Sequence, residues 1–330
     1  MEIQKILFEI IKQRLPANLR LADIIGEILN IGTDSVYRRI RGETELTITE
    51  LSKLCIHFNI SMDAILNYSP NDIMLKYSPL YTNNIDNYYK YIEDFASLLE
   101  NMVKSGGNKE IIIMSQDIAT VHFYPYLELI LFKIYTWFKS FNNFQLTYDK
   151  FVETLNLERV SGFYKKITEA YLQIPSSEIW TTKTIRPFLY LLHYYSDLNC
   201  FENKDTINII VNQLIDLLKN IESCTEKGEK KYIGKPVSFR MYLSPIDFSN
   251  NYMIIRRDRV NMISIKLHAI NSVFTSDSCF YSEINKLIED MTCQSLLLSG
   301  TSARERFLFF QKLKSEITLS AIATTIFESD

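Results

Sequence analysis

Apolar residues in the first 66 positions recur three and four residues apart, in short blocks that each end at a turn residue. Spacing of this kind places the apolar side chains on one side of a helix. The blocks span residues 2–15, 21–29, 33–41, 48–58 and 61–66. The pattern therefore predicts an all-α domain of five short helices at the N-terminus.

Two of these helices carry end signals. Gly42 follows the third helix, and glycine is the residue type that most readily caps a helix in the left-handed conformation. Thr47 and Glu50 form a capping box at the start of the fourth helix, where each side chain satisfies a free backbone amide. A short turn separates the second helix from the third, which is a helix-turn-helix arrangement.

Residues 20–66 resemble the XRE, or λ-repressor-like, DNA-binding domain. The matching segments are LADIIGEILNIGTDSVYRRIRGE and, after Gly42, TITELSKLCIHFNISMDAIL. Gly32 stands where the family usually has Ser at the N-cap of the third helix, and Arg39 stands at a position that is normally buried. The resemblance implies that the third helix lies in the major groove of DNA, with its N-terminal residues at the base edges.

The resemblance also implies which side chains face DNA. They are Thr33, Asp34, Tyr37, Arg38 and Arg41. We expect Arg38 to bond a guanine bidentately, which is the commonest specific contact, and Arg41 to contact phosphate. Tyr37 and Thr33 would touch phosphate or a thymine methyl group, and Asp34 would be a favourable charge at the helix N-terminus. The alternative is that the arginines are only a solvated face, but their clustering on the one helix that should enter DNA favours DNA binding.

The remaining sequence predicts a linker and a larger domain. Residues 1–68 form the DNA-binding domain, residues 69–86 contain Ser-Pro twice and read as a linker, and residues 87–330 form the C-terminal domain. Strands are predicted at 109–114, 237–243, 252–256 and 260–266, and helices at 85–104, 125–140, most of 148–226, 279–297 and 303–318. This order predicts an α+β or α/β domain with a central sheet and a long helical section.

Motifs for chemistry are scarce in the C-terminal domain. It contains no phosphate-binding glycine loop, nucleophile elbow or zinc-protease signature. His193 and Asp197 lie four apart on a predicted helix, but no third metal ligand accompanies them. Aromatic residues within 123–137 and 188–195 either line a small-molecule pocket or pack in the core. Heptad-spaced apolar residues over 207–221 indicate either a dimer seam or a buried bundle helix.

Charge and cysteine content narrow the classes further. Lys and Arg number 36 against 39 Asp and Glu, a net charge of −3, so any DNA-binding surface must be local. The five cysteines are scattered and include no C-x-x-C pair, which argues against a disulfide framework and a zinc site. No apolar run suggests a signal peptide or a membrane span. We therefore expect a cytoplasmic, bacterial protein with no cofactor, no bound metal and no membrane partner.

These features favour a sequence-specific transcription regulator that binds double-stranded DNA as a homodimer. The C-terminal domain would dimerise, and its sensing of a small-molecule effector stays open. In the alternative hypothesis the C-terminal domain is an enzyme or a protein-interaction module, which the helix-turn-helix tethers or autoregulates. A third hypothesis is that the helical domain binds protein rather than DNA.

Overall fold

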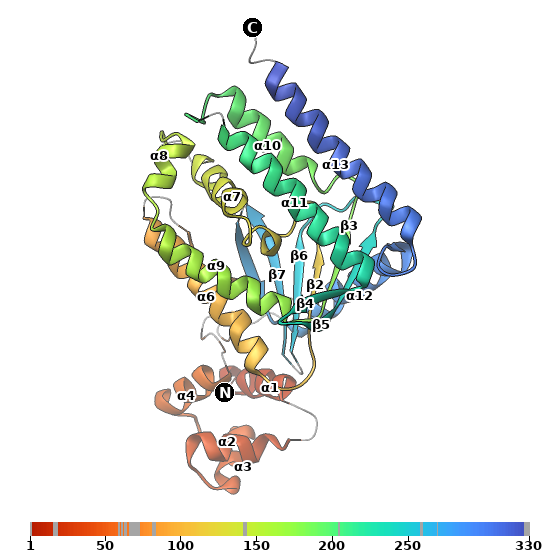
Figure 1. Ribbon diagram of the computed structural model, residues 1–330. Helices are drawn as coiled ribbons and strands as arrows, with labels where there is room; N and C mark the ends of the chain where they lie inside the picture. The colour runs from red at the N-terminus through yellow and green to blue at the C-terminus, as the bar shows by residue number, and fades with distance from the viewer. Residues whose placement is uncertain are drawn as a thin grey trace. The chain divides into compact units, whose positions relative to one another are not determined.

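The chain divides into two compact units, Met1–Met74 and Leu75–Asp330, each with its own hydrophobic core (Figure 1). The computed structural model describes residues 2–326 except 16–18, 59, 61, 63–64, 66–72, 81–83, 141–143, 204, 258–259 and 269. The expected end of the first domain, at residue 68, lies outside the described residues.

The first unit is helical, as its sequence pattern predicts. Its helices are α1 (Glu2–Arg14), α2 (Leu21–Leu29), α3 (Thr33–Ile40) and α4 (Ile48–Phe58). One side of each helix contributes to the core, in which Leu7, Ile25, Val36 and Leu54 are completely buried. The fifth helix predicted at residues 61–66 lies mostly outside the described residues.

Both predicted helix-end signals are present in the first unit. Gly42 has a φ of +76°, and the backbone N–H of Glu43 donates to the carbonyl of Arg38 at 2.8 Å. At the start of α4, the Thr47 N–H donates to Glu50 Oε2 at 2.9 Å, and the Glu50 N–H donates to Thr47 Oγ1 at 3.2 Å. These bonds satisfy backbone groups that helix ends otherwise leave open.

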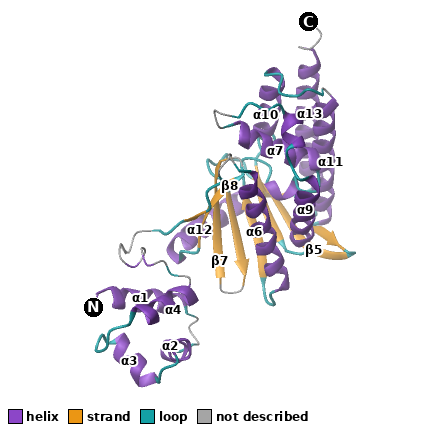
Figure 2. Cartoon of the chain, turned by 90° about the vertical axis from the view of Figure 1, so that its left-hand side faces the viewer, coloured by secondary structure: helices purple, strands orange, loops and turns teal. Residues whose placement is uncertain are grey.

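Within the described residues, nine strands form a mixed sheet in the second unit (Figure 2). Across the sheet the strands are β1 (Lys76–Tyr77), β8 (Asn271–Thr275), β7 (Val260–His268), β6 (Tyr252–Arg257), β2 (Lys109–Met114), β3 (Ser176–Trp180), β5 (Lys235–Leu243) and β4 (Glu229–Tyr232), while β9 (Leu296–Leu297) pairs with β5. β2, β3 and β5 are mutually parallel, and the other described pairs are antiparallel. The carboxyl ends of the three parallel strands therefore meet at one edge of the sheet.

Helices cover both faces of the sheet. They are α6 (Ile85–Lys104), the short 3₁₀ helix η1 (Thr120–His122), α7 (Leu127–Lys139), α8 (Tyr148–Glu153), α9 (Leu157–Leu172), α10 (Arg186–Asp197), α11 (Asp205–Lys227), α12 (Ser278–Gln294) and α13 (Ala303–Ile326). Side chains alternate between the faces along β2. Ile111 and Ile113 join the large core with α6, α7, α9 and α11, whereas Ile112 and Met114 join a smaller core under α12.

The heptad-spaced residues of α11 are buried inside the second unit. The helix packs against α7 and α13, and Ile210, Leu214 and Leu217 are at most 1 % exposed. Of the two interpretations of residues 207–221, the buried bundle helix is therefore correct, and these side chains do not form a dimer seam.

The predicted strands at 109–114, 237–243, 252–256 and 260–266 are confirmed as β2, β5, β6 and β7. The prediction is wrong at β3, which lies within the stretch expected to be helical, at β1, which lies within the expected linker, and at β9, which lies at the end of the helix expected at 279–297. It also contains no strand at β4 or β8. β3 reads SSEIW, in which two serines and a glutamate interrupt the β-branched or aromatic run that marks a strand. Pairing with β2 and β5 and complete burial hold this segment in the sheet.

Candidate functional site

The turn between α2 and α3 sets the orientation of α3. Asn30 ends α2 in the left-handed conformation, with a φ of +56°, and α3 begins directly after Gly32. A Cβ at Gly26 would lie 3.0 Å from the carbonyl oxygen of Ile31, so a glycine there lets the turn approach α2. Val36 is the buried residue of α3 and fixes the rotation of the helix about its axis.

This rotation leaves the predicted DNA-facing side chains in solvent. Every one of them is exposed: Thr33, Asp34, Tyr37, Arg38 and Arg41. Tyr37 has 45 % of its surface exposed although it is a large aromatic residue. Tyr37 and the two arginines therefore lie on the exposed face of α3.

Arg39 points the other way and ties α3 to α4. Its Nη2 lies 2.8 Å from Glu50 Oε1, its Nη1 donates to the carbonyl of Ser35 at 3.2 Å, and its side chain is 15 % exposed. Burial alone would raise the pKa of Glu50, but the hydrogen bonds from Thr47 and Arg39 hold that pKa below its ordinary value. Arg39 thus has a carboxylate partner, and that partner is the glutamate of the capping box.

Arg41 has a weaker and fully exposed partner. Its Nε lies 2.6 Å from Glu43 Oε1, with 58 % and 50 % of the two side chains exposed. An ion pair in solvent contributes little to stability. Glu43 therefore holds the guanidinium of Arg41 only weakly.

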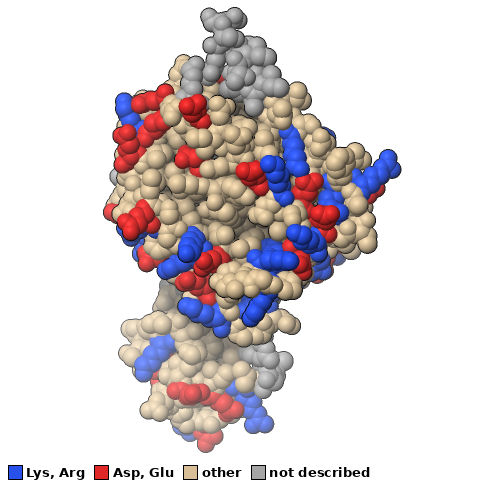
Figure 3. Space-filling view, viewed as in Figure 1, with Lys and Arg blue, Asp and Glu red and all other residues tan. Residues whose placement is uncertain are grey.

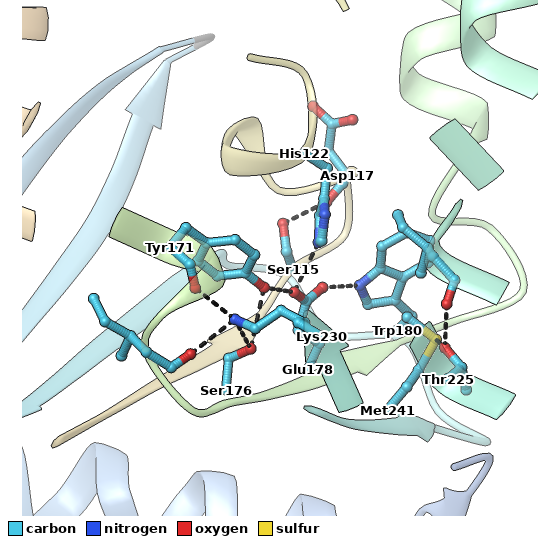
Figure 4. Close-up of polar contacts among 12 residues, drawn as sticks. Ser115, Asp117, His122, Tyr171, Ser176, Glu178, Trp180, Thr225, Lys230 and Met241 are labelled. Carbon is cyan, nitrogen blue, oxygen red and sulfur yellow. Dashed lines mark hydrogen bonds and ion pairs between the residues drawn. The ribbon is translucent and has the colours of Figure 1, made fainter. Parts of the chain in front are cut away.

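A second candidate site lies in the second unit, around the carboxylate of Glu178 on β3 (Figure 4). Glu178 is completely buried and accepts three hydrogen bonds. The donors are His122 Nε2 at 2.7 Å, the Tyr171 hydroxyl at 2.6 Å and Trp180 Nε1 at 2.8 Å. A buried carboxylate needs such partners to replace the water that it loses.

The surroundings of Glu178 and Tyr171 determine which of these two side chains carries the proton. Burial alone would raise the pKa of Glu178, but the attraction of His122 and the three hydrogen bonds hold that pKa below its ordinary value. Burial and the neighbouring Glu178 carboxylate raise the pKa of Tyr171 well above its ordinary value. The negative charge therefore stays on Glu178 and the proton on Tyr171.

Lys230 of β4 lies next to this network and is 2 % exposed. Its Nζ donates to the carbonyls of Tyr171 and Ile174, both at 2.8 Å, and to Ser176 Oγ at 2.9 Å. Burial lowers the pKa of Lys230 to about 7, with the attraction of Glu178 acting in the opposite direction. Lys230 is thus a group of this network whose charge can change near neutral pH.

A further charge network lies on the segment that follows β2. Asp117 Oδ2 accepts hydrogen bonds from Lys133 of α7 and, at 3.2 Å, from Lys266 of β7. The exposed fractions of the Asp117, Lys133 and Lys266 side chains are 8 %, 3 % and 20 %. Asp117 Oδ1 is buried and accepts no hydrogen bond from the part of the chain that the structure describes. Two ammonium groups against one carboxylate leave this cluster with one excess positive charge.

The candidates that the sequence offered in the C-terminal domain have other surroundings. His193 hydrogen-bonds to Ser320 of α13, while Asp197 is exposed. Phe123 and Phe188 stack in the core with ring centroids 5.4 Å apart. The core interpretation of the aromatic residues therefore applies to these two rings and to the equally buried Tyr135.

The sequence reasoning missed both buried charge networks. A usable signal was the glutamate of SSEIW, because a charged residue in a short fully buried segment needs a specific partner. A second signal was Asp117, which comes three residues after the apolar run of β2, where parallel strands collect polar residues. His122, the partner of Glu178, and Lys266, a partner of Asp117, are too distant in the chain to be found without the fold.

On the face that Figure 3 shows, acidic side chains gather at the upper left of the second unit, and basic and acidic side chains are mixed along its right-hand and lower parts. No helix among the described residues is long and apolar enough to cross a membrane. Comparison of the chain with protein-family models, curated proteins and solved structures finds no match.

Proposed function

We propose that the protein is a sequence-specific transcription regulator that binds double-stranded DNA as a homodimer. The observation that carries the proposal is the exposed face of α3, which follows a short turn after α2 and presents Tyr37, Arg38 and Arg41 together. Arg39 is held by Glu50 on the opposite side, so the arginines of α3 are divided between an internal ion pair and an outward face. On a helix that only faced solvent, nothing would require one arginine to be paired internally while the other two stay exposed.

Each outward side chain has a role in the proposed complex. Arg38 reads a guanine bidentately in the major groove. Arg41 leaves Glu43 and binds a phosphate, while Thr33 and Tyr37 contact phosphate or a thymine methyl group. Asp34 stays at the N-terminus of α3 as a favourable charge for the helix dipole.

The charge of the first unit explains why a dimer is proposed. Residues 1–68 contain eight basic and nine acidic residues, a net charge of −1. The electrostatic attraction of one copy for DNA is therefore small, and two copies on one duplex double the phosphate contacts and their salt dependence. Two-fold symmetry places the half-sites about one helical turn, roughly 34 Å, apart.

The test begins by selecting bound duplexes from a random-sequence pool with the full-length protein. Fluorescence anisotropy then compares wild type, Arg38→Ala and Arg41→Ala on the selected duplex and on scrambled DNA, at several salt concentrations. We expect Arg38→Ala to cost about 1–3 kcal/mol and to relax preference at one base pair, and Arg41→Ala to weaken all sequences alike and lower the salt slope by about 1. Lys5→Ala, an exposed lysine on α1, is the matched control.

Two results would overturn the proposal. One is a pool that shows no enrichment while the protein is folded and at concentrations above those of nonspecific binding. The other is an Arg38→Ala variant that binds the selected duplex as tightly and as selectively as Lys5→Ala does. Sedimentation on the selected duplex tests the dimer separately, because a single copy per duplex contradicts it.

A further inference from the structure

A cavity of about 80 Å³ lies on the sheet beside the Asp117 cluster. Its floor consists of two rows of side chains from β2, β6, β7 and β8. Strand pairing places Ile113 beside Met253, Met253 beside Ser264, and Ser264 beside Phe274. All four line the cavity and form a first row that is mostly apolar.

The second row consists of polar side chains, each two residues from a member of the first row along the chain. It contains Ser115, Asn251, Lys266 and Ser272, which all line the cavity. Lys266 pairs with Ser272, its N–H donates to the Asn251 carbonyl at 3.1 Å, and Ser115 Oγ donates to Asn251 Oδ1 at 3.1 Å. The floor thus changes from apolar to polar along the direction of the strands.

The walls add apolar surface and no charge. Tyr91 and Phe95 of α6 and Tyr124 beside η1 line the cavity. The Tyr91 hydroxyl donates to the carbonyl of Ile270 at 2.8 Å. Burial raises the pKa of Tyr91 to about 12 and that of Tyr124 well above its ordinary value, so both rings are neutral at physiological pH.

Lys266 is the cation among the described lining residues, and its charge is not balanced. Asp117 is shared between Lys266 and Lys133, so the cluster keeps one excess positive charge. Burial lowers the pKa of Lys266, the repulsion of Lys133 lowers it further, and Asp117 acts against both. A single negative charge beside Lys266 would balance the cluster.

We propose that this cavity binds a small monocarboxylate, with its carboxylate at Lys266 and its hydrocarbon part over Ile113, Met253 and Phe274. The volume is about half that of the engineered cavity of ~150 Å³ that holds benzene, which suits a short aliphatic chain. Doubly charged inorganic anions fit poorly, because the excess charge is one and most of the wall cannot replace their water. The site is separate from the proposed DNA-binding helix, and its ligand is tested without DNA.

The experiment uses the full-length chain and three probes: acetate, propionate and butyrate. Ligand-observed NMR and calorimetry measure their binding at constant ionic strength, with propionamide and 1-propanol as neutral counterparts and chloride and phosphate as inorganic anions. We expect propionate or butyrate to bind with a dissociation constant on the order of a millimolar or tighter. The neutral counterparts should bind at least about tenfold more weakly.

Two variants block the site by different means. Lys266→Met removes the charge while Asp117 keeps Lys133, and Ser264→Leu fills the floor without a change of charge. Each should weaken carboxylate binding at least about tenfold, whereas Lys235→Met, an exposed lysine on β5, should leave it unchanged. If Lys266→Met fails to fold, Ser264→Leu decides the matter.

Several outcomes overturn the proposal. They are no binding of any carboxylate to the folded protein, equal binding by 1-propanol or propionamide, equal competition by chloride or phosphate, and undiminished binding by both folded variants. Failure of DNA selection leaves all of these measurements unaffected, so the proposed carboxylate site and the proposed DNA-binding helix are tested independently.

Discussion

Replacing Glu178 by Gln tests the buried network with the smallest possible change of shape. The carboxylate oxygens of Glu178 accept from His122, Tyr171 and Trp180. Gln has one acceptor oxygen and one donor nitrogen. In one orientation of the amide, its oxygen stays with His122 and Tyr171, and its nitrogen faces the indole N–H of Trp180. In the other orientation, the oxygen faces Trp180, and the nitrogen faces His122 and Tyr171. In the first orientation a buried donor loses its acceptor, and in both the negative charge beside His122 is gone.

The size of the effect follows from these contacts. A hydrogen bond to a charged group contributes about 1.5–3 kcal/mol. Glu178→Gln leaves the shape of the side chain unchanged but replaces the charged acceptor of these bonds by a neutral amide. We therefore expect Glu178→Gln to lower the free energy of unfolding of the second unit by about 1.5–3 kcal/mol.

Urea unfolding followed by tryptophan fluorescence is the assay. The chain has two tryptophans, Trp137 and Trp180, and both are buried in the second unit, so the signal reports that unit alone. With a urea dependence of about 3 kcal/mol per molar, the midpoint should fall by about 0.5–1 M. Glu226→Gln, an exposed glutamate on α11, is the control and should shift stability by less than about 0.5 kcal/mol. Equal midpoints for Glu178→Gln and Glu226→Gln would refute the reasoning.

The dependence of the free energy of unfolding on pH, measured at acid pH, gives an independent check. The pKa of Glu178 is lower in the folded protein than its ordinary value of 4.5, so the unfolded chain takes up the proton first as the pH falls. The stabilisation is complete above pH 4.5 and is lost as the pH falls through the lower folded pKa. The stability gap between wild type and Glu178→Gln should therefore narrow below about pH 4.5.

Two further substitutions test Lys230, which is buried, and Glu50, which belongs to the capping box of α4. The pKa of Lys230 falls from 10.5 to about 7 on folding, so the unfolded chain binds more protons between these values and stability of the second unit should rise with pH, by up to ~1.4 kcal/mol per unit. Lys230→Met should reduce this slope in urea titrations from about pH 7 to about 9.5, below tyrosine ionisation, and a wild-type midpoint that stays level over the window contradicts the assignment. Glu50→Ala removes the acceptor for the Thr47 N–H, which is one half of the capping box of α4, and also the partner of Arg39, and should cost the first unit about 1–2 kcal/mol. Hydrogen exchange of the α3 and α4 amides measures it, with Glu43→Ala as control, and indistinguishable exchange in the two variants would speak against the Arg39 contact.

Local sequence signals predict helices best where the helix carries its own ends and its own apolar side. The helix predicted at 85–104 matches α6 residue for residue. The side chain of Asn84 accepts from the Asp86 N–H at 2.8 Å and begins the helix, and buried residues from Tyr88 to Met102 keep its apolar side on the core. In the first unit, the helix end at Gly42 and the capping box of Thr47 and Glu50 are likewise predictable from the sequence, because the groups that bond there lie within a few residues of each other.

The second unit shows where such reading ends. Glu178 and His122 are 56 residues apart, and Lys266 is 149 residues from Asp117. Nothing in the local pattern connects them, because the contact exists only after β2, β3 and β7 join one sheet. β3 was missed for the same reason. Glu178 is bound by α9 and η1, Ser176 by β4, and Ser177 donates to Glu110 of β2, so a strand of low apolar content is stable only in this surrounding.

Both charge networks have a common structural cause. A chain that leaves one parallel strand must cross over the sheet before it enters the next. The segment after β2 makes such a crossing and contributes a residue to each network, since Asp117 binds Lys266 and His122 binds Glu178. Between them, Thr120 lines the cavity and begins η1, which ends at His122. Thr120 and Val121 of η1 line the cavity, and the next residue, His122, binds Glu178, so one three-residue helix joins the wall of the cavity to the buried carboxylate.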